Sequence, residues 1–228
     1  YNIFISGATS TGKTTFLNVL ADYIPKTERV ITIEDSAELQ IHGIENLVRM
    51  EVRQADGDGV SNVTLRDLIR TSLRMRPDRI IVGEVRGEEA LDMIQSMNTG
   101  HDGSLSTGHA NSPQDMLSRL ETMALFASDI PIQAIRKQIA SSIDIIVQLE
   151  RLRDRSRRVT AIAEVLDCTE DAYILNPIFE FHEQDNLVME SSSYGDIPER
   201  VVGQLERTGY HLMHRRKLHA AALESAEI

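Results

Sequence analysis

The chain has 228 residues, 41% hydrophobic and 26% charged, which is ordinary for a soluble globular protein of one sizeable domain. Its apolar runs fall short of the ~20 residues that span a membrane. A lone cysteine, Cys168, excludes a disulfide framework and a four-cysteine zinc site. A formal net charge of −11 argues against non-specific nucleic-acid binding, although it leaves a local basic groove open. We therefore expect a cytoplasmic protein without a nucleic-acid partner.

The first element is a strand-like run at residues 2–6, which leads at once into a glycine-containing loop. A natural protein seldom starts on a buried strand, so we expect an N-terminal domain that is absent from this chain. Helical spacing follows at 13–23, where apolar residues recur on one face until Pro25 ends the pattern.

The rest of the chain alternates strands with helices. This order predicts an α/β fold with a mainly parallel sheet covered by helices on both faces. A late pair of strands around a charged turn breaks the alternation and predicts an antiparallel extension. Strands are expected at 29–33, 47–52, 79–82, 104–107, 144–152, 157–166 and 173–181, and helices at 64–74, 88–97, 113–125, 131–142 and 198–223.

The loop after the first strand has the pattern G-x-x-x-x-G-K-[ST], set between a predicted strand and a predicted helix. Glycines let such a loop curl its N–H groups inward, and the helix N-terminus adds positive potential for phosphate. Lys13 is expected to reach the β- and γ-phosphates of ATP, Thr14 to hold Mg²⁺, and Thr15 to contact the α-phosphate. A chance match is disfavoured because only 13 residues are glycine. The candidate nucleotide-binding residues are Gly7, Thr9, Ser10, Thr11, Gly12, Lys13, Thr14 and Thr15.

Carboxylates follow two predicted strands, where α/β sheets place their ligands. Glu84 follows residues 80–83, and Glu34 follows residues 30–33, with Glu38 one helical turn further on. Either Glu34 or Glu84 could orient or deprotonate the attacking water, and the pattern does not choose between them. Gly83 stands where such ATPases usually carry aspartate, so the metal candidates are Thr14 and Glu84. The alternative for each glutamate is a solvated strand end.

Histidines and arginines supply further candidates. His101 and His109 flank the strand predicted at 104–107 and are suited to sense phosphate, although ordinary loop histidines fit equally well. Arg76, just before the strand that ends at Glu84, could steady γ-phosphate charge within the chain or across a subunit boundary. Five arginines within residues 151–158 favour a solvated turn over a contact with an acidic subunit or a lipid headgroup.

Taken together, these motifs closely resemble those of the secretion ATPase superfamily, which drives type II and type IV secretion and type IV pilus assembly. Those enzymes carry an Asp box, a glycine before the catalytic-strand glutamate, and a His box. The stretch 97–113 looks most like the CpaF-like subgroup of tight-adherence (Flp) pili. The resemblance rests on the phosphate loop followed by Thr32-Ile33-Glu34-Asp35-Ser36-Ala37-Glu38-Leu39, Ile80-Ile81-Val82-Gly83-Glu84-Val85-Arg86-Gly87 and Thr99-Gly100-His101-Asp102-Gly103-Ser104.

The resemblance covers residues 1–167 and implies a RecA-like ATPase core there. Residues 168–228 would form a C-terminal extension of sheet and helices packed on or trailing that core. It also implies a homo-hexamer in the full-length protein, an inner-membrane platform protein as partner, and peripheral contact with the inner face of the membrane. By position, the family's nucleotide-site residues map onto Lys13, Thr14, Glu34, Arg76, Glu84 and His101.

Two other function classes use a phosphate loop. A nucleic-acid-stimulated RecA-type motor is disfavoured by the acidic charge and by the lack of an aromatic-interleaved basic groove. A small-molecule kinase would usually need an arginine-rich lid. ATP hydrolysis that powers pilus assembly or protein secretion is the leading hypothesis.

Overall fold

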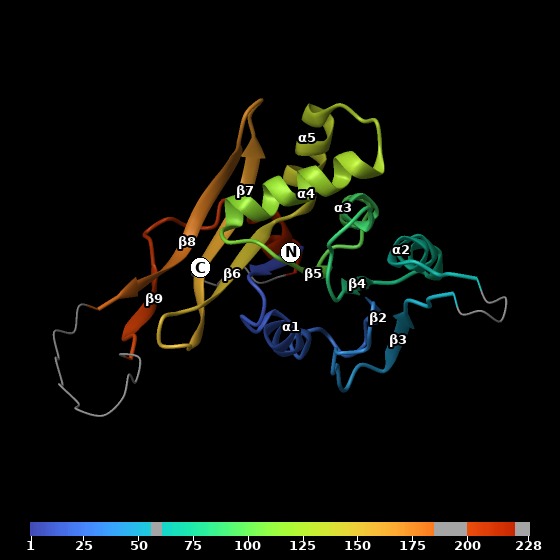
Figure 1. Cartoon of the computed structure of the whole chain (residues 1–228), viewed down its shortest axis with the longest axis horizontal. Helices are drawn as coiled ribbons and strands as arrows, with labels where there is room; N and C mark the ends of the chain where they lie inside the picture. The colour runs from blue at the N-terminus through green and yellow to red at the C-terminus, as the bar shows by residue number, and fades with distance from the viewer. Residues whose placement is uncertain (56–60, 185–199, 222–228) are drawn as a thin grey trace.

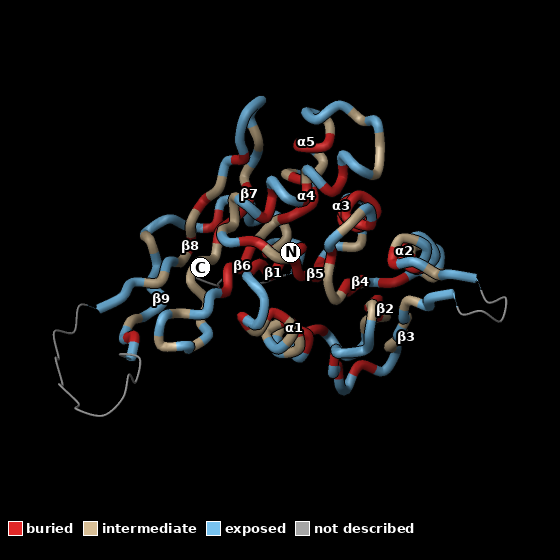
Figure 2. The backbone as a smooth tube through the Cα atoms, in the orientation of Figure 1, coloured by how far each residue is buried: buried red, intermediate tan, exposed pale blue. Residues whose placement is uncertain are grey.

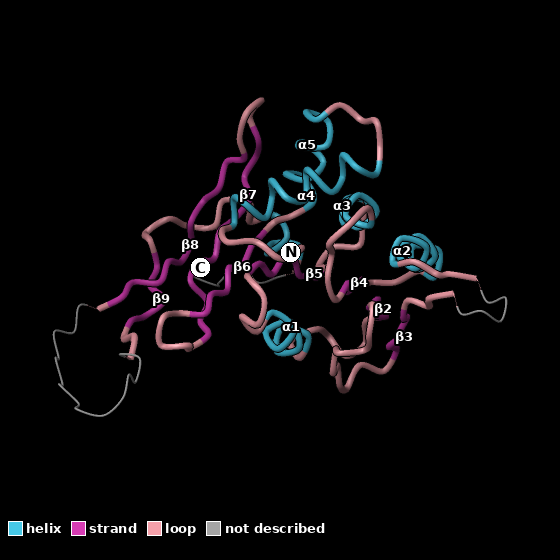
Figure 3. The backbone as a smooth tube through the Cα atoms, viewed as in Figure 1, coloured by secondary structure: helices cyan, strands magenta, loops and turns pink. Residues whose placement is uncertain are grey.

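The computed structural model describes residues 1–55, 61–184 and 200–221, which fold around one nine-stranded sheet. The strands lie in the order β3-β2-β4-β5-β1-β6-β7-β8-β9 (Figures 1 and 3). They are β1 (Ile3–Gly7), β2 (Arg29–Glu34), β3 (Asn46–Glu51), β4 (Arg79–Val82), β5 (Leu105–Gly108), β6 (Ile145–Arg151), β7 (Arg157–Cys168), β8 (Tyr173–Glu183) and β9 (Gly203–Arg207). The helices are α1 (Lys13–Ala21), α2 (Leu65–Ser72), α3 (Glu89–Asn98), α4 (Pro113–Ala127), α5 (Ile132–Ser142) and α6 (Arg216–Ala220), with a short 3-10 turn η1 (Leu73–Met75).

The sheet has a parallel part and an antiparallel part. From β3 to β6 every neighbouring pair is parallel, whereas β6, β7, β8 and β9 pair antiparallel. The predicted α/β class, mainly parallel sheet and antiparallel extension are therefore confirmed. At the start of α2, Thr64 and Asp67 form a reciprocal capping box.

The helix predicted at 198–223 is wrong for most of its length. Residues 203–207 form strand β9 against β8, and only the short α6 is helical. The ends of that prediction, 198–199 and 222–223, lie outside the described residues. As a strand, this segment gains backbone hydrogen bonds to the exposed edge of the sheet. As a largely polar helix, it would gain little stability from packing. The division of the chain at residue 167 stays a prediction, and β7 runs across it.

Helices cover both faces of the parallel strands (Figure 1). On one face α1 packs against a cluster that includes Ile5, Leu17 and Ile81, and on the other α2, α3, α4 and α5 pack against a larger cluster that includes Phe4, Ile80 and Met116. The central strands are consequently the most buried part of the chain, and β9 is exposed (Figure 2). No described helix is long and apolar enough to cross a bilayer.

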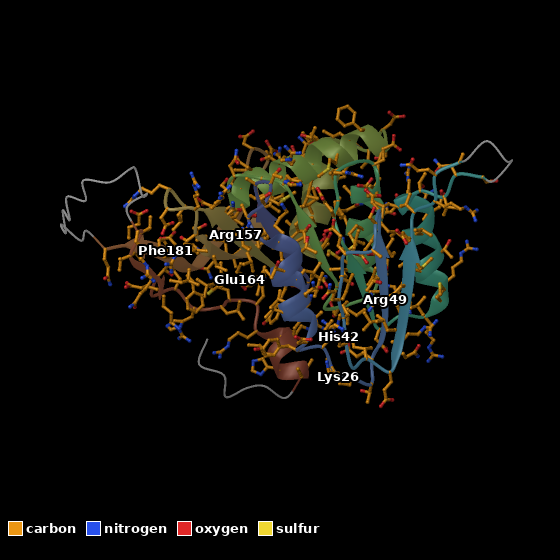
Figure 4. All side chains as sticks on the ribbon, turned by 60° about the horizontal axis from the view of Figure 1, so that its bottom comes forward. Lys26, His42, Arg49, Arg157, Glu164 and Phe181 are labelled. Carbon is orange, nitrogen blue, oxygen red and sulfur yellow. The ribbon has the colours of Figure 1, made fainter. Side chains whose placement is uncertain are left out.

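The direction of the parallel strands sorts the candidate residues between two edges of the sheet. At the carboxyl edge lie the phosphate loop after β1, Glu34 at the end of β2, Glu84 beyond β4 and His109 beyond β5. At the amino edge lie the segments that precede β4 and β5. The connection from β2 to β3 is tied down by backbone carbonyl contacts: Lys26 Nζ donates to His42 O (3.2 Å), and Arg49 Nη1 donates to Leu39 O (2.7 Å) (Figure 4).

Gly103, at the amino edge, is packed against an ion pair. A Cβ there would clash with Arg79 Nη1, and Arg79 Nε donates to Glu28 Oε2 at 2.8 Å. Gly100 has a similar positive φ, +92° against +87°, but open space around it. We expect Gly103→Ala to lower the free energy of unfolding by about 1–2 kcal/mol more than Gly100→Ala, since both carry the strain and only one meets a clash. Urea denaturation of the two variants measures the difference; equal losses would contradict the packing argument.

Candidate nucleotide-binding site

The loop between β1 and α1 is held in an unusual backbone conformation. Ser10 has φ 62° and Gly12 φ 96°, both left-handed, which a serine adopts at a cost. Thr11 Oγ1 donates to Ala8 O at 2.9 Å, and Phe16 N donates to Gly12 O at 2.9 Å as the first helical bond. A Cβ on Gly7 would lie 2.5 Å from Leu149 O, so only glycine fits there. This is the context that a phosphate-binding loop requires.

Lys13 is the buried cation of the loop. Its Nζ donates to Gly7 O at 2.9 Å and Ala8 O at 3.1 Å, so the ammonium lies folded back over the loop. Burial lowers the pKa of Lys13 below its ordinary value because it penalises the charged form, and the nearby Glu84 carboxylate acts in the opposite direction. A phosphate anion beside Nζ would favour the charged form further.

His109 connects Lys13 to Glu84. Its Nδ1 lies 3.2 Å from Lys13 Nζ, and its Nε2 lies 2.8 Å from Glu84 Oε1. Because an ammonium only donates, Nδ1 accepts from it, and the neutral imidazole then carries its proton on Nε2 and donates it to Glu84. The Glu84 side chain is about one third exposed (35%), so this carboxylate is open to water.

His109, rather than His101, is the histidine that the fold brings to the loop. Sequence reasoning named both but selected His101. The usable signal was position: His109 directly follows the carboxyl end of β5, whereas His101 precedes its amino end. His101 Nδ1 instead lies 3.2 Å from Ser96 O.

Glu34 occupies the same edge in a different way. The residue is 5% exposed, and its Oε1 accepts hydrogen bonds from the backbone N–H groups of Glu38 and Leu39, both at 2.9 Å. A Cβ on Gly83 would come within 3.1 Å of Glu34 Cγ, so a longer side chain at position 83 would crowd this glutamate. That contact gives a physical reason for glycine in the place of the usual aspartate.

A polar cleft opens beside the loop and is lined by Thr14, Glu34, Asp35, Glu38, Glu84 and Arg86. Thr14 Oγ1 lies 3.5 Å from Glu38 Oε2, and Arg86 pairs with Asp35. Residues 35–41 form no helix, so the prediction that Glu38 lies one helical turn beyond Glu34 is wrong, although its carboxylate does reach the site. Among the described residues, no three His, Cys, Asp or Glu side chains are arranged so that they could hold a metal ion by themselves.

Arg76 does not reach the phosphate loop. It caps η1 with a left-handed φ of 54° before β4, at the amino edge of the sheet. His101 lies at the same edge. Within this chain, therefore, the fold assembles Lys13, Thr14, Glu34 and Glu84 and leaves Arg76 and His101 apart.

The arginine run between β6 and β7 is not simply solvated. Arg157 Nε donates to Ser10 O at 2.8 Å, and the Arg158 guanidinium lies over the Phe181 ring, 5.5 Å from its centroid. Arg153 pairs with Glu183 at 2.5 Å. The predicted solvated turn is consistent with Arg157, which is exposed although it contacts Ser10, whereas Arg158 is only partly exposed.

Comparison with known proteins finds a family whose model matches most of the chain. The family model described as type II/IV secretion system protein matches residues 1–192. A putative conjugal transfer protein of Mycobacterium tuberculosis is 38% identical over 159 residues, covering 70% of this chain and 45% of the relative. The type IV secretion system protein PtlH of Bordetella pertussis is 37% identical over 159 residues, covering 68% and 47%.

A solved structure agrees with these relatives. The crystal structure of the VirB11 ATPase from the Brucella suis type IV secretion system, in complex with sulphate, superposes with a TM-score of 0.65 at 32% identity. The match covers 72% of this chain and 49% of that one. The chain thus spans about half the length of these proteins.

Proposed function

The chain belongs to the type II/IV secretion system protein family, and from this premise we propose that it hydrolyses ATP to power protein secretion or type IV pilus assembly. The observation that carries the proposal is the contact chain from Lys13 through His109 to Glu84 beside the phosphate loop. It joins a phosphate-binding cation to a water-accessible carboxylate, as triphosphate hydrolysis requires. The CpaF-like, Flp-type subgroup is proposed on the sequence of residues 97–113.

Nucleotide binding is assigned to the loop and its lysine. The backbone N–H groups of residues 9–15 would surround the β-phosphate, and the N-terminus of α1 would add favourable potential. Lys13 would exchange its bonds to Gly7 O and Ala8 O for phosphate oxygens, whose negative charge favours the ammonium form that burial disfavours. The cleft also fits the Mg²⁺ that accompanies ATP, since this ion takes a hydroxyl, one or two carboxylates and phosphate oxygens. Thr14 and Glu84 would hold it, and when bound it neutralises phosphate charge.

Hydrolysis is assigned to Glu84 with His109. Water attacks the γ-phosphorus, its proton passes to the Glu84 carboxylate, and the bond to the β–γ bridging oxygen breaks to yield ADP and phosphate. His109 donates Nε2–H to Glu84 and would hold the carboxylate in place. Its Nδ1 would link this carboxylate to Lys13. Glu34 is given the positioning role, because its Oε1 already holds the turn that carries Glu38.

We further propose a homo-hexamer in the full-length protein, docked through an inner-membrane platform protein on the cytoplasmic face of the membrane. Arg76 and His101 lie away from the loop of their own chain. Any nucleotide that they contact would therefore be one bound to the phosphate loop of a neighbouring subunit, across a ring interface.

Lys13→Ala tests the nucleotide assignment. We expect ADP to bind about 10- to 100-fold more weakly, because charged hydrogen bonds to phosphate contribute about 1.5–3 kcal/mol. Isothermal titration measures the dissociation constant, and Lys26→Ala is the control, since Lys26 donates to the carbonyls of Asp22 and His42, away from the loop. Unchanged binding in Lys13→Ala would refute the assignment, and phosphate release that depends on added single-stranded DNA would favour the nucleic-acid motor.

A further inference from the structure

Arg157, on β7, contacts the backbone of the phosphate loop. Its Nε donates to Ser10 O at 2.8 Å. Its Cδ lies 3.5 Å from the position that a Cβ on Gly12 would take. One side chain from β7 thus donates to left-handed Ser10, 147 positions away in sequence, and lies beside left-handed Gly12. In Figure 4 it lies toward the N-terminal end of α1.

The hairpin that carries Arg157 is well anchored. Leu152 N donates to Ser156 O at 2.8 Å, and Asp154 Oδ1 accepts from Ser156 N at 2.9 Å. Asp154 Oδ2 also accepts from Val201 N at 2.9 Å, which ties the turn to the segment before β9. The Ser156 hydroxyl also donates to Asp154 Oδ1, at 2.6 Å. This bond first, and those from Ser156 N and Val201 N, lower the pKa of Asp154 to about 2, so the turn keeps its carboxylate at neutral pH. Arg157 is therefore presented to the loop by a fixed support.

The positive charge of Arg157 is not neutralised by a carboxylate of the described residues. In the described part of the chain it forms no ion pair, whereas Arg66, Arg79, Arg136 and Arg153 each meet a carboxylate. The chain has a net charge of −11, and four carboxylates line the cleft beside Thr14. An anionic nucleotide approaching this cleft needs local positive charge, and an unpaired guanidinium at the loop supplies it.

From these contacts we propose that Arg157 is a positioning residue for nucleotide binding, which holds the phosphate loop in its binding conformation through Ser10 O and adds positive charge beside the loop. The inference rests on the proposed function and extends it to a residue outside the phosphate-loop motif. Without the bond to Ser10 O, the strained left-handed serine relaxes, and the loop amides converge in only a fraction of molecules. Apparent affinity falls by that fraction.

The test compares Arg157→Ala, Arg157→Lys and the control Arg74→Ala. Arg74 is an exposed arginine of η1 at the amino edge, so its loss changes net charge equally without touching the loop. We expect Arg157→Ala to raise the dissociation constant for ADP and the KM for ATP about tenfold, with kcat within about threefold of wild type. Arg157→Lys, which keeps the charge and a donor, should recover most of the affinity, and Arg74→Ala should bind as wild type.

Each outcome is decisive. Equal ADP affinity in wild type and Arg157→Ala would overturn the inference, as would a loss of kcat at unchanged KM. If Arg157→Ala melts at a lower temperature without nucleotide, Arg157→Lys decides. A folded Arg157→Lys with wild-type ADP affinity supports the inference. A folded Arg157→Lys that binds ADP as weakly as Arg157→Ala overturns it. A wild-type chain that binds neither ADP nor ATP would refute the proposed function instead, which keeps the two failures apart.

Discussion

Replacing Glu84 with glutamine is expected to slow phosphate release from ATP by about 10²- to 10⁴-fold, the usual contribution of a positioned general base. Glutamine matches the shape of the carboxylate and can still accept from His109 Nε2, 2.8 Å away in the native chain, but it cannot take a proton from water. ATP affinity should stay within about threefold of wild type, because Lys13 and the loop amides are unchanged. Single-turnover phosphate release and nucleotide titration measure the two quantities separately.

Glu34→Gln is the matched control for this prediction. Glu34 Oε1 accepts from two backbone N–H groups, and the amide oxygen of glutamine can accept the same bonds. We expect its hydrolysis rate to stay within about tenfold of wild type. If Glu34→Gln loses the rate and Glu84→Gln keeps it, the roles assigned to the two glutamates are reversed.

Glu164→Ala is expected to cause the largest loss of stability, about 3–5 kcal/mol in the free energy of unfolding. Glu164 lies on β7 with 1% of its surface exposed. Its carboxylate accepts from Met213 N at 2.9 Å, from His214 N at 2.7 Å and from Asn176 Nδ2 at 2.9 Å. Alanine would leave these three donors without their acceptor and release residues 211–214 from the sheet.

The measurement is guanidinium denaturation followed by circular dichroism, since the chain has no tryptophan. Glu180→Ala removes an exposed glutamate from the neighbouring strand β8 and should change stability by no more than about 0.5 kcal/mol. Glu164→Gln keeps one good acceptor and should fall between the two. A loss below about 1 kcal/mol for Glu164→Ala would mean that the C-terminal segment is held elsewhere, for example by Lys217, which pairs with Asp144 at 2.6 Å.

Much of the site could be read from local pattern. Glycine spacing between a strand and a helix located the phosphate loop, because the backbone there admits few other residues, as the contact between Gly7 and Leu149 O makes plain. The acidic candidates were found because parallel strands all end at one edge, so a carboxylate after a strand is placed near the loop whatever the rest of the chain does. The α/β class followed from the same alternation.

Tertiary structure decided between residues and elements that these patterns could not distinguish. His101 and His109 flank one short strand and look alike in sequence, but the direction of β5 sends them to opposite edges, and only His109 meets Lys13 and Glu84. The segment 198–223 carries a weak helical pattern, and pairing with β8 overrode it in part. Arg157 sits in a run that looks like a solvated turn, and its partner, Ser10, is 147 residues away. Local sequence determined which chemistry is available, because loop and strand-end residues act through near neighbours. The fold alone decided which histidine and which arginine lie at the phosphate loop, because their partners come from distant parts of the chain.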